Sequence, residues 1–359
     1  MEASSQHVRF CTAPDGVQIA WEKIGRGPPI VRAAYWLTHI DHDWRSIIWR
    51  PWLDAFARHA TLIRYDQRGC GLSDRAVANI SFEAWLHDLE TVVDAAGLAR
   101  FTLLGMSQGA AIAVAYAVRH PERVAKLVIY GGFARGRRKR GEPEQDEEAD
   151  LQERAVRLGW GRENPAFRQI FTSQFMANAS PEQLAAWDDM QRLSCSPETA
   201  ERIVKLTHMI DVVDLLPKVT VPTLVMHSTH DARIPFEQGR LLASLIPGTR
   251  FVPLESGGHT LHPREPAFDR FFEELARFVS EDTTEGTSKD HPRIKGLTAR
   301  ERQVLDELAG GRSNDEIATA LGISPKTVRN VVSVLFDKLD VPTRAAAIVK
   351  ARDAGFGRT

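Results

Sequence analysis

One stretch of the chain, residues 101–112, constrains the fold more than any other. The apolar run 101–104 ends at Gly105, and the chain then passes Ser107 and reaches Gly109, where an alanine-rich helical pattern begins. This is a G-x-S-x-G pattern between a strand and a helix, the context in which it holds a serine exposed at a tight turn. Glycines are favoured on both sides because the turn brings neighbouring backbone close, and the N-terminus of the following helix can stabilise negative charge beside the serine. The alternative is an incidental serine in a glycine-rich turn.

Two later residues supply the partners that a serine nucleophile needs. Asp231 follows the strand pattern of residues 223–227 and a short polar turn, and His259 follows the strand pattern of residues 250–254 behind two glycines. Both are expected in loops at the carboxyl ends of strands, on the same rim as Ser107. A histidine can remove the serine proton, and an aspartate can orient and stabilise the imidazolium. The order of the three residues therefore favours a catalytic interpretation.

Strand and helix patterns alternate over most of the first 280 residues, which predicts an α/β fold with a doubly wound, mostly parallel sheet covered on both faces. Residues 8–24 alternate around a Pro-Asp-Gly turn and predict a hairpin. Residues 44–59 have the spacing of one helix. An insert of helical patterns at about 134–216 interrupts the alternation, and it predicts a cap over a pocket.

A block of opposite charges opens this insert. Basic residues at 135–140 are followed directly by acidic residues at 142–150. Adjacent charges of opposite sign predict a solvated loop that compensates its own charge. A nuclear-localisation or nucleic-acid-binding patch is the alternative.

On these patterns, residues 1–280 are assigned to one domain, and its residues 8–280 resemble an α/β-hydrolase with a helical cap. The resemblance implies a catalytic triad of Ser107, Asp231 and His259. Family members usually carry His-Gly after the first central strand, where a backbone N–H helps to form the oxyanion hole. The corresponding segment here is residues 33–36, Ala-Ala-Tyr-Trp. The motifs that carry the resemblance are Gly105-Met-Ser-Gln-Gly109, Asp66-Gln-Arg-Gly-Cys-Gly-Leu-Ser-Asp74, His230-Asp231 and Gly257-Gly258-His259.

By this alignment the oxyanion donors are the backbone N–H groups of Trp36 and Gln108. Loss of one such donor lowers the rate by about a hundred- to a thousandfold. The geometry at Trp36 therefore decides whether the site can catalyse hydrolysis. His39 and its neighbours at 41–43 suggest a metal only weakly, because no further ligand cluster is evident, and we predict no metal and no cofactor. The residues expected to shape the ligand pocket are Trp36, His39, Trp44, Met106, Phe175 and His208.

After a polar linker at 281–295, residues 296–359 follow a different pattern. Thr298 and Ser313 each begin a capping box, and Pro325 occupies a favoured first helical position. Four short helices in about sixty residues, with a tight turn at 322–324, predict a helix-turn-helix unit. A purely structural four-helix unit is the alternative.

This segment resembles the LuxR-type DNA-binding domain along its full length. The matching residues are Leu297-Thr-Ala-Arg-Glu301, Glu316-Ile-Ala318, Leu321-Gly-Ile-Ser324, Lys326-Thr-Val-Arg329 and Lys338-Leu339.

The resemblance implies a recognition helix at 325–338. Arg329 and Asn330 carry the donors that read guanine and adenine edges. Lys326 and Thr327 suit phosphates, which position a helix without specifying sequence. The exposed face is expected to present Lys326, Arg329, Asn330 and Ser333.

The charge of this segment bears on its oligomeric state. It holds ten Lys and Arg against eight Asp and Glu, a net charge of +2, which is modest for a DNA-binding domain. A weak excess favours a homodimer, in which two half-sites share the binding. Family dimers often meet through the last helix, here about 343–354, with Ala347, Ile348 and Ala351 as candidates.

The whole chain gives no electrostatic bias towards nucleic acid or membrane, because its formal net charge is −1 over 359 residues. Its three cysteines are scattered and do not predict a disulfide framework. The N-terminal residues are polar and no apolar run approaches a membrane span, so we expect a cytoplasmic protein with no membrane partner.

Two functions remain open. The first is a ligand-responsive transcriptional regulator, which binds operator DNA and senses a small ester, lactone or similar molecule in a serine-hydrolase-like pocket, with or without hydrolysing it. The second is an active serine esterase or lactonase whose DNA-binding domain is secondary. Fusion to a DNA-binding domain favours the first, and the complete triad favours the second.

Overall fold

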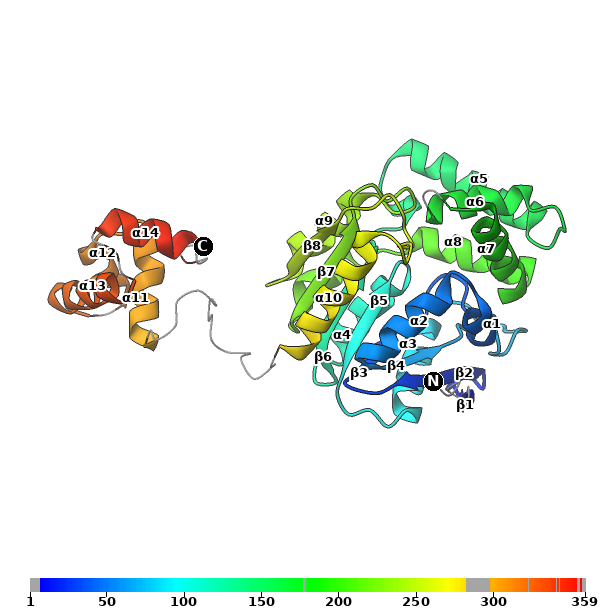
Figure 1. Cartoon of the computed structure of the whole chain (residues 1–359), viewed down its shortest axis with the longest axis horizontal. Helices are drawn as coiled ribbons and strands as arrows, with labels where there is room; N and C mark the ends of the chain where they lie inside the picture. Colours follow the sequence, from blue (N-terminus) through cyan, green and yellow to red (C-terminus); the bar gives the residue numbers. More distant parts are fainter. Residues whose placement is uncertain are drawn as a thin grey trace. The chain divides into compact units, whose positions relative to one another are not determined.

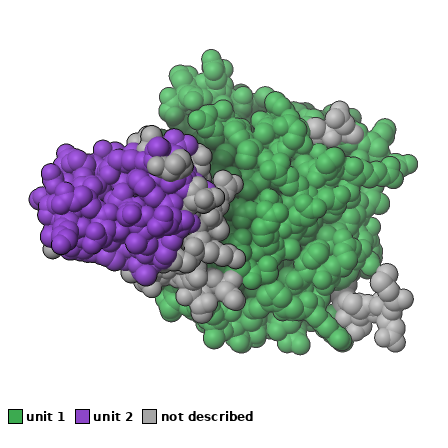
Figure 2. Space-filling view, turned by 60° about the vertical axis from the view of Figure 1, so that its left-hand side comes forward, with its two compact units in different colours: residues 1–281 green, residues 282–359 purple. Residues whose placement is uncertain are grey.

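The computed structural model describes residues 7–176, 179–281, 298–321, 323–339, 341, 343–353 and 356. The chain divides into two compact units, residues 1–281 and 282–359 (Figure 2). The predicted linker at 281–295 lies outside the described residues except for Glu281, and the predicted turn at 322–324 is described only from Ile323.

The first unit is built on an eight-stranded sheet with the order β1-β2-β4-β3-β5-β6-β7-β8 (Figure 1). The predicted hairpin pairs β1 with β2, and β2 pairs antiparallel with β4; all later pairs are parallel. This confirms the expected mostly parallel sheet. Every residue of β5 and β7 is buried, as expected for strands covered on both faces. The strands are β1 Arg9–Thr12, β2 Gln18–Gly25, β3 Pro29–Arg32, β4 Thr61–Tyr65, β5 Phe101–Met106, β6 Val124–Tyr130, β7 Thr223–Ser228 and β8 Arg250–Leu254.

Helices cover both faces of this sheet. Helices α2 (Trp49–His59) and α10 (Pro266–Ser280) pack together in one layer. Helices α3 (Phe82–Ala95), α4 (Gly109–Arg119) and α9 (Phe236–Leu245) form the other with the 3₁₀ helix η2 (Val213–Lys218). The helix expected over 44–59 is two helices, because α1 (Ile40–Arg45) ends at Ser46, whose backbone is extended.

The cap consists of four helices that follow β6, and its two ends are joined at its base. The Gly136 N–H donates to the Ile210 carbonyl at 2.8 Å, and the Val212 N–H donates to the Ala134 carbonyl at 3.0 Å. Three of the helices begin with proline, which suits the first helical turn. They are α5 Pro143–Gly159, α6 Ala166–Phe175, α7 Pro181–Ser194 and α8 Pro197–Met209.

The charge block at the start of the cap is not the solvated loop that its composition predicted. Residues 137–139 form the 3₁₀ helix η1, which packs against α5 and α8. Arg137 is buried and pairs with Glu148, and Arg138 pairs with Asp150 and Glu153 on α5. The opposite charges do pair, but across a helix–helix contact. A sequence pattern reports adjacent charges and not which of them the cap buries.

A buried ionic network fixes the loop between β3 and α1, which carries Trp36. Arg64 on β4 pairs with Glu22 and Asp43, and its guanidinium donates to the Ile40 carbonyl at 2.9 Å. Asp66 accepts the Ile40 N–H at 2.9 Å. Burial raises the pKa of Asp66 to about 7, against the lowering effect of its backbone hydrogen bonds. Because removing one member of a buried network leaves an uncompensated charge, the position of this loop is strongly specified.

The second unit is described as four helices around a core of its own: α11 Ala299–Ala309, α12 Asn314–Leu321, α13 Pro325–Leu339 and α14 Arg344–Asp353. Thr298 forms the predicted capping box with Glu301. Ala347 and Ala351, expected at a dimer face, are fully buried in this core. That expectation is wrong for these two residues, since the helical period turns them towards α11 rather than outward.

Candidate active site

Ser107 lies in the turn between β5 and α4 and has a left-handed backbone, with φ of 50°. This conformation costs a non-glycine residue about 1–3 kcal/mol and is found where function requires a fixed geometry. The Ser107 N–H donates to the carbonyl of Tyr130, at the end of the neighbouring strand, at 2.9 Å. The sheet therefore holds the serine at its carboxyl edge.

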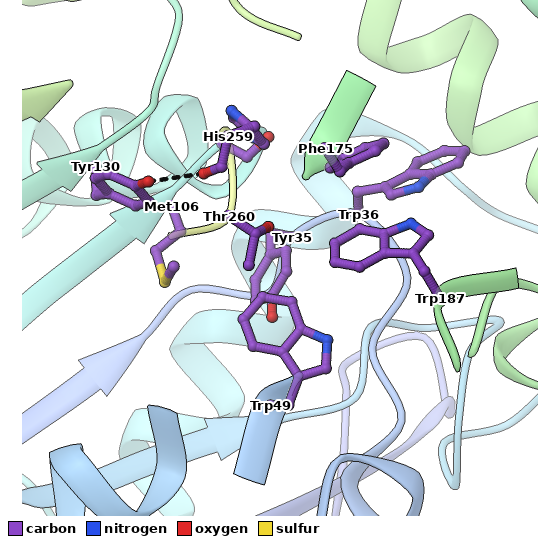
Figure 3. A pocket seen from close by; sticks show the side chains of 10 residues that line it. Tyr35, Trp36, Trp49, Met106, Tyr130, Phe175, Trp187, His259 and Thr260 are labelled. Atoms are coloured by element: carbon purple, nitrogen blue, oxygen red, sulfur yellow. Dashed lines mark hydrogen bonds between the residues drawn. The ribbon is translucent and has the colours of Figure 1, made fainter. Parts of the chain in front are cut away.

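Asp231 and His259 come together at that edge. His259 Nδ1 lies 2.7 Å from Asp231 Oδ2, while Asp231 Oδ1 accepts the N–H groups of Arg233 at 2.8 Å and Ile234 at 2.9 Å. The Tyr130 hydroxyl donates to the His259 carbonyl at 2.7 Å, the bond drawn in Figure 3. The loops that carry the two residues are thus fixed by the backbone as well as by the side chains.

The electrostatics of this pair suit a base and its orienting carboxylate. Burial acts to raise the pKa of Asp231, but the charge and hydrogen bond of His259 outweigh it, and the pKa is lowered. An ionised Asp231 accepts a hydrogen bond from the Nδ1–H group, which leaves Nε2 of His259 as the nitrogen able to accept a proton from a serine. The Asp231–His259 pair thus has the geometry of a histidine oriented by a carboxylate.

Ser107 and His259 line one cavity, whose wall is mostly aromatic (Figure 3). Its volume is about 20 Å³, measured as the space open to the centre of a water-sized sphere. A cavity of that size holds about one water molecule. The lining residues are Tyr35, Trp36, Trp49, Met106, Ser107, Tyr130, Phe175, Trp187, His259 and Thr260.

Three of the six residues expected to shape the pocket line this cavity: Trp36, Met106 and Phe175. The other three lie elsewhere. His39 caps α1 by accepting the His42 N–H. The Trp44 indole donates to both carboxylate oxygens of Glu22, at 3.1 Å each. His208 is buried within the cap beside Gln152 and Glu153.

Five lining residues escaped the sequence analysis: Tyr35, Trp49, Tyr130, Trp187 and Thr260. Tyr130 carries the clearest signal, since it ends the strand next to the serine strand, and Thr260 directly follows His259. The ring centres of Trp49 and Trp187 lie 6.0 Å apart in a tilted arrangement, although the two residues are far apart in the chain. Only the packing of the cap on the core brings the two rings together, and no local sequence pattern predicts that contact.

The two candidate oxyanion donors, the backbone N–H groups of Gln108 and Trp36, come from two separate segments. Gln108 follows the serine at the start of α4, and Trp36 stands in the loop after β3. Among the described residues, the non-glycine residues with positive φ are Ser107 and Leu37, which precede Gln108 and follow Trp36. Backbone strain thus sits next to each of the two candidate donors.

The glycines of the motif allow the helix to approach that loop. A Cβ on Gly109 would lie 2.9 Å from the carbonyl oxygen of Ala34 and 3.0 Å from that of Ala33. A Cβ on Gly105 would lie 2.6 Å from the Cα of Ala110. Real side chains essentially never approach so closely. These two positions therefore need glycine if β5, α4 and the loop after β3 are to meet.

In the second unit, α13 presents the expected DNA-contacting residues on one exposed face. Its opposite face packs into the core through Val328, Val332, Leu335 and Leu339. The Thr327 hydroxyl lies 2.8 Å from that of Ser324, so Thr327 also helps to start the helix. The exposed set is Lys326, Thr327, Arg329, Asn330 and Ser333.

Metal sites and membrane spans can be judged for the described residues. They contain no group of three or more His, Cys, Asp or Glu that is placed to hold a metal ion. None of the helices described here has the length and apolar character needed to cross a bilayer.

Comparisons with known proteins match the two units separately. A family model for the alpha/beta hydrolase fold matches residues 42–173, and one for the luxR family of bacterial regulatory proteins matches residues 295–351. RutD of Azorhizobium caulinodans is 29% identical over 65% of this chain and 86% of its own. A pyrrolizixenacetamide deacetylase from Xenorhabdus hominickii is 24% identical over 69% of this chain and 90% of its own.

Solved structures resemble the first unit. The esterase EaEST of Exiguobacterium antarcticum has a TM-score of 0.64 and 27% identity over 76% of this chain and 99% of its own. The enol-lactonase of Burkholderia xenovorans LB400 has a TM-score of 0.64 and 23% identity over 76% of this chain and 100% of its own, a likeness of fold.

Proposed function

Because this chain joins an alpha/beta hydrolase domain to a DNA-binding domain of the luxR family, we propose that it is a ligand-responsive transcriptional regulator. The ligand would be a small ester, lactone or similar molecule bound at Ser107, and the target of α13 would be operator DNA. The observation that carries the proposal is that an ordered Asp231–His259 pair beside a strained serine shares one chain with an exposed recognition helix.

The size of the serine cavity supports a sensing role. An organic ligand cannot enter a space of about 20 Å³ unless aromatic side chains of its wall move. Phe175 and Trp187 belong to the cap, and their rings lie 4.7 Å apart. Ligand binding therefore selects a different arrangement of the cap, and a ligand that prefers one of two states shifts the equilibrium between them. We propose that this shift changes the geometry of a homodimer and so its affinity for DNA.

The dimer contact proposed for the second unit must use the exposed side of α14. Val349 is 59% exposed and adjoins the partly buried Ile348, whereas Ala347 and Ala351 are buried. A dimer would allow two modest positive surfaces to bind two half-sites.

Ser107 and the Asp231–His259 pair support the second candidate, an active serine hydrolase whose DNA-binding domain is secondary. The esterase EaEST, at 27% identity, is consistent with ester chemistry on this fold. The two functions are compatible if the protein hydrolyses its own inducer and so resets its signal.

Selection from a pool of random DNA duplexes with the full chain tests the first candidate, and p-nitrophenyl acetate tests the second. We expect enrichment of a two-fold symmetric site and measurable ester turnover. Recovery of no preferred sequence would overturn the regulator, and a wild-type protein without turnover would overturn the hydrolase.

The Ser107→Ala variant separates the roles of the serine once a DNA site is known. In a sensor, the variant loses turnover but keeps its ligand-dependent change in DNA affinity. In turnover-coupled control, both disappear together. Unfolding temperature serves as the control for either result.

A further inference from the structure

A second cleft lies between the cap and the loop after β7 that carries Asp231. Its volume is about 390 Å³ on the same measure that gives about 20 Å³ at Ser107. Small-molecule sites in proteins commonly measure about 300–1,000 Å³. The cleft shares no lining residue with the serine cavity. It is thus a space near Asp231 that is already large enough for an organic ligand.

The inner end of the cleft is basic. Arg233 is buried, and its guanidinium donates to two neutral amide oxygens, those of Gln152 at 3.1 Å and Gln174 at 2.9 Å. Arg137, also buried, lines the same cleft and pairs with Glu148.

The arginines of this region act on one another electrostatically. Burial, followed by the charges of Arg137 and Arg140, lowers the pKa of Arg233 to about 9, against the opposing effect of Asp231 and Glu148. Burial and the charge of Arg137 likewise lower the pKa of Arg140 to about 10, against Glu142 and Glu148. An added anion would favour the charged form of both guanidinium groups.

The outer end of the cleft is apolar. Leu151 is 57% exposed on α5, next to Gln152, and Ile170 on α6 is half-buried. Both line the cleft. A ligand that satisfies both ends carries an anionic group at one end and an apolar body at the other.

We propose that this cleft is a second ligand site that binds a small organic acid, with its carboxylate at Arg233 and Arg137 and its apolar body against Leu151 and Ile170. The planar guanidinium suits a carboxylate because it offers two parallel N–H donors. The site does not require Ser107 to be catalytic, and the acid is not a substrate of the triad.

The wall between the two cavities suggests what the acid does. Gln174 and Phe175 are neighbours at the end of α6, and they line the cleft and the serine cavity respectively. The Arg233 guanidinium lies 5.3 Å from the centre of the Phe175 ring, which lies 5.5 Å from the His259 ring. An acid that fixes Arg233 therefore also restrains the aromatic wall that a ligand at Ser107 must displace.

Thermal unfolding of the full chain at constant ionic strength tests the proposal, with sodium benzoate as the acid, benzamide as its neutral isostere and inorganic phosphate as an anion without an apolar body. We expect benzoate to raise the unfolding temperature more than either of the others. An equal effect of benzamide overturns the anionic site, an equal effect of phosphate overturns the apolar requirement, and no effect of any of them overturns the site.

The Gln174→Glu variant places a carboxylate where the acid would bind. We expect it to unfold at a higher temperature than the wild type without ligand and to bind benzoate at least tenfold more weakly by titration calorimetry. Ser173→Glu adds the same charge on the exposed side of α6 and should bind benzoate as the wild type does. Undiminished binding by Gln174→Glu overturns the proposal.

Crystals soaked with 4-bromobenzoate give the position directly. Anomalous scattering should place the bromine towards Leu151, and the difference density should place the carboxylate towards Arg233. Bromine in the serine cavity instead overturns the assignment. Ser107→Ala should bind benzoate as the wild type does. The benzoate site can therefore be confirmed or overturned whether or not Ser107 proves to be catalytic.

Discussion

The candidate functional residues of the two units are held in opposite ways. Asp231 and His259 are buried and are fixed by several hydrogen bonds each. Arg329 and Asn330 are exposed, and the helix that carries them is what positions them. Chemistry at a serine depends on groups being in place before the substrate arrives, whereas a base edge is met by a side chain that orders on contact. Substitutions should therefore have larger and more cooperative effects in the first unit than in the second.

Asp231→Asn should give the largest effect. The amide cannot hold the His259 tautomer that accepts the serine proton, so we expect turnover of p-nitrophenyl acetate to fall about ten-thousandfold. Asp189→Asn makes the same chemical change at an exposed position of α7 and should leave turnover unchanged. Turnover of Asp231→Asn within tenfold of the wild type would show that burial of the pair serves structure alone.

Gly109→Ala tests whether the approach of α4 to the Trp36 loop matters. The added Cβ would meet the Ala34 and Ala33 carbonyls and push apart the segments that carry the two proposed oxyanion donors, which should lower kcat by about a hundred- to a thousandfold. Ala111→Gly on the same helix is the control, because it costs about 1 kcal/mol of stability without adding atoms. If both variants lose activity only in proportion to stability, the close approach has no role in rate.

Arg329→Ala should cost less, because one exposed contact is lost from many. Once a DNA site is selected, we expect the binding free energy to weaken by about 1–3 kcal/mol and the preference at one base pair to relax. Lys326→Ala is the matched comparison: it should weaken binding evenly across sequences and reduce the salt dependence by about one phosphate contact. If the two variants showed the same sequence preference and the same salt dependence, Arg329 and Lys326 would not differ as a base contact and a phosphate contact.

The contrast also explains what could be predicted from the sequence. Ser107, Asp231 and His259 are set by local motifs at strand ends, and their order along the chain places them on one rim. The exposed face of α13 follows from helical period alone, because one face is polar and the other apolar. In both cases the information is local.

The cavity wall was less predictable because its residues come from distant segments. Trp44 was expected in the pocket, but the break at Ser46 separates its helix from the one that carries Trp49, and it is Trp49 that lines the cavity. His208 and Arg233 show the same limit: their surroundings are made by the cap folding onto the core. Side chains that meet only through tertiary packing leave no periodic signal.

The smallest effect concerns His227, which lies buried in β7 behind the triad. Its Nε2 donates to the Ile234 carbonyl at 3.0 Å, and burial lowers its pKa below the ordinary 6.5 although Asp231 acts in the opposite direction. As pH falls below about 6.5, the unfolded chain therefore binds a proton that the folded protein does not, and the free energy of unfolding falls by up to about 1.4 kcal/mol per pH unit for this group.

His227→Gln removes that titration and keeps an N–H donor for the Ile234 carbonyl. We expect stability to fall less steeply between pH 6.5 and 5.5 than in the wild type. Urea unfolding followed by tryptophan fluorescence reports the first unit alone, because all eight tryptophans lie within residues 1–281. His230→Gln, an exposed histidine three residues away, should leave the pH dependence unchanged. If the free energy of unfolding changed equally with pH in His227→Gln and the wild type, His227 would take up its proton within the folded protein. The buried surroundings of the first unit would then tolerate charge as readily as the exposed face of α13.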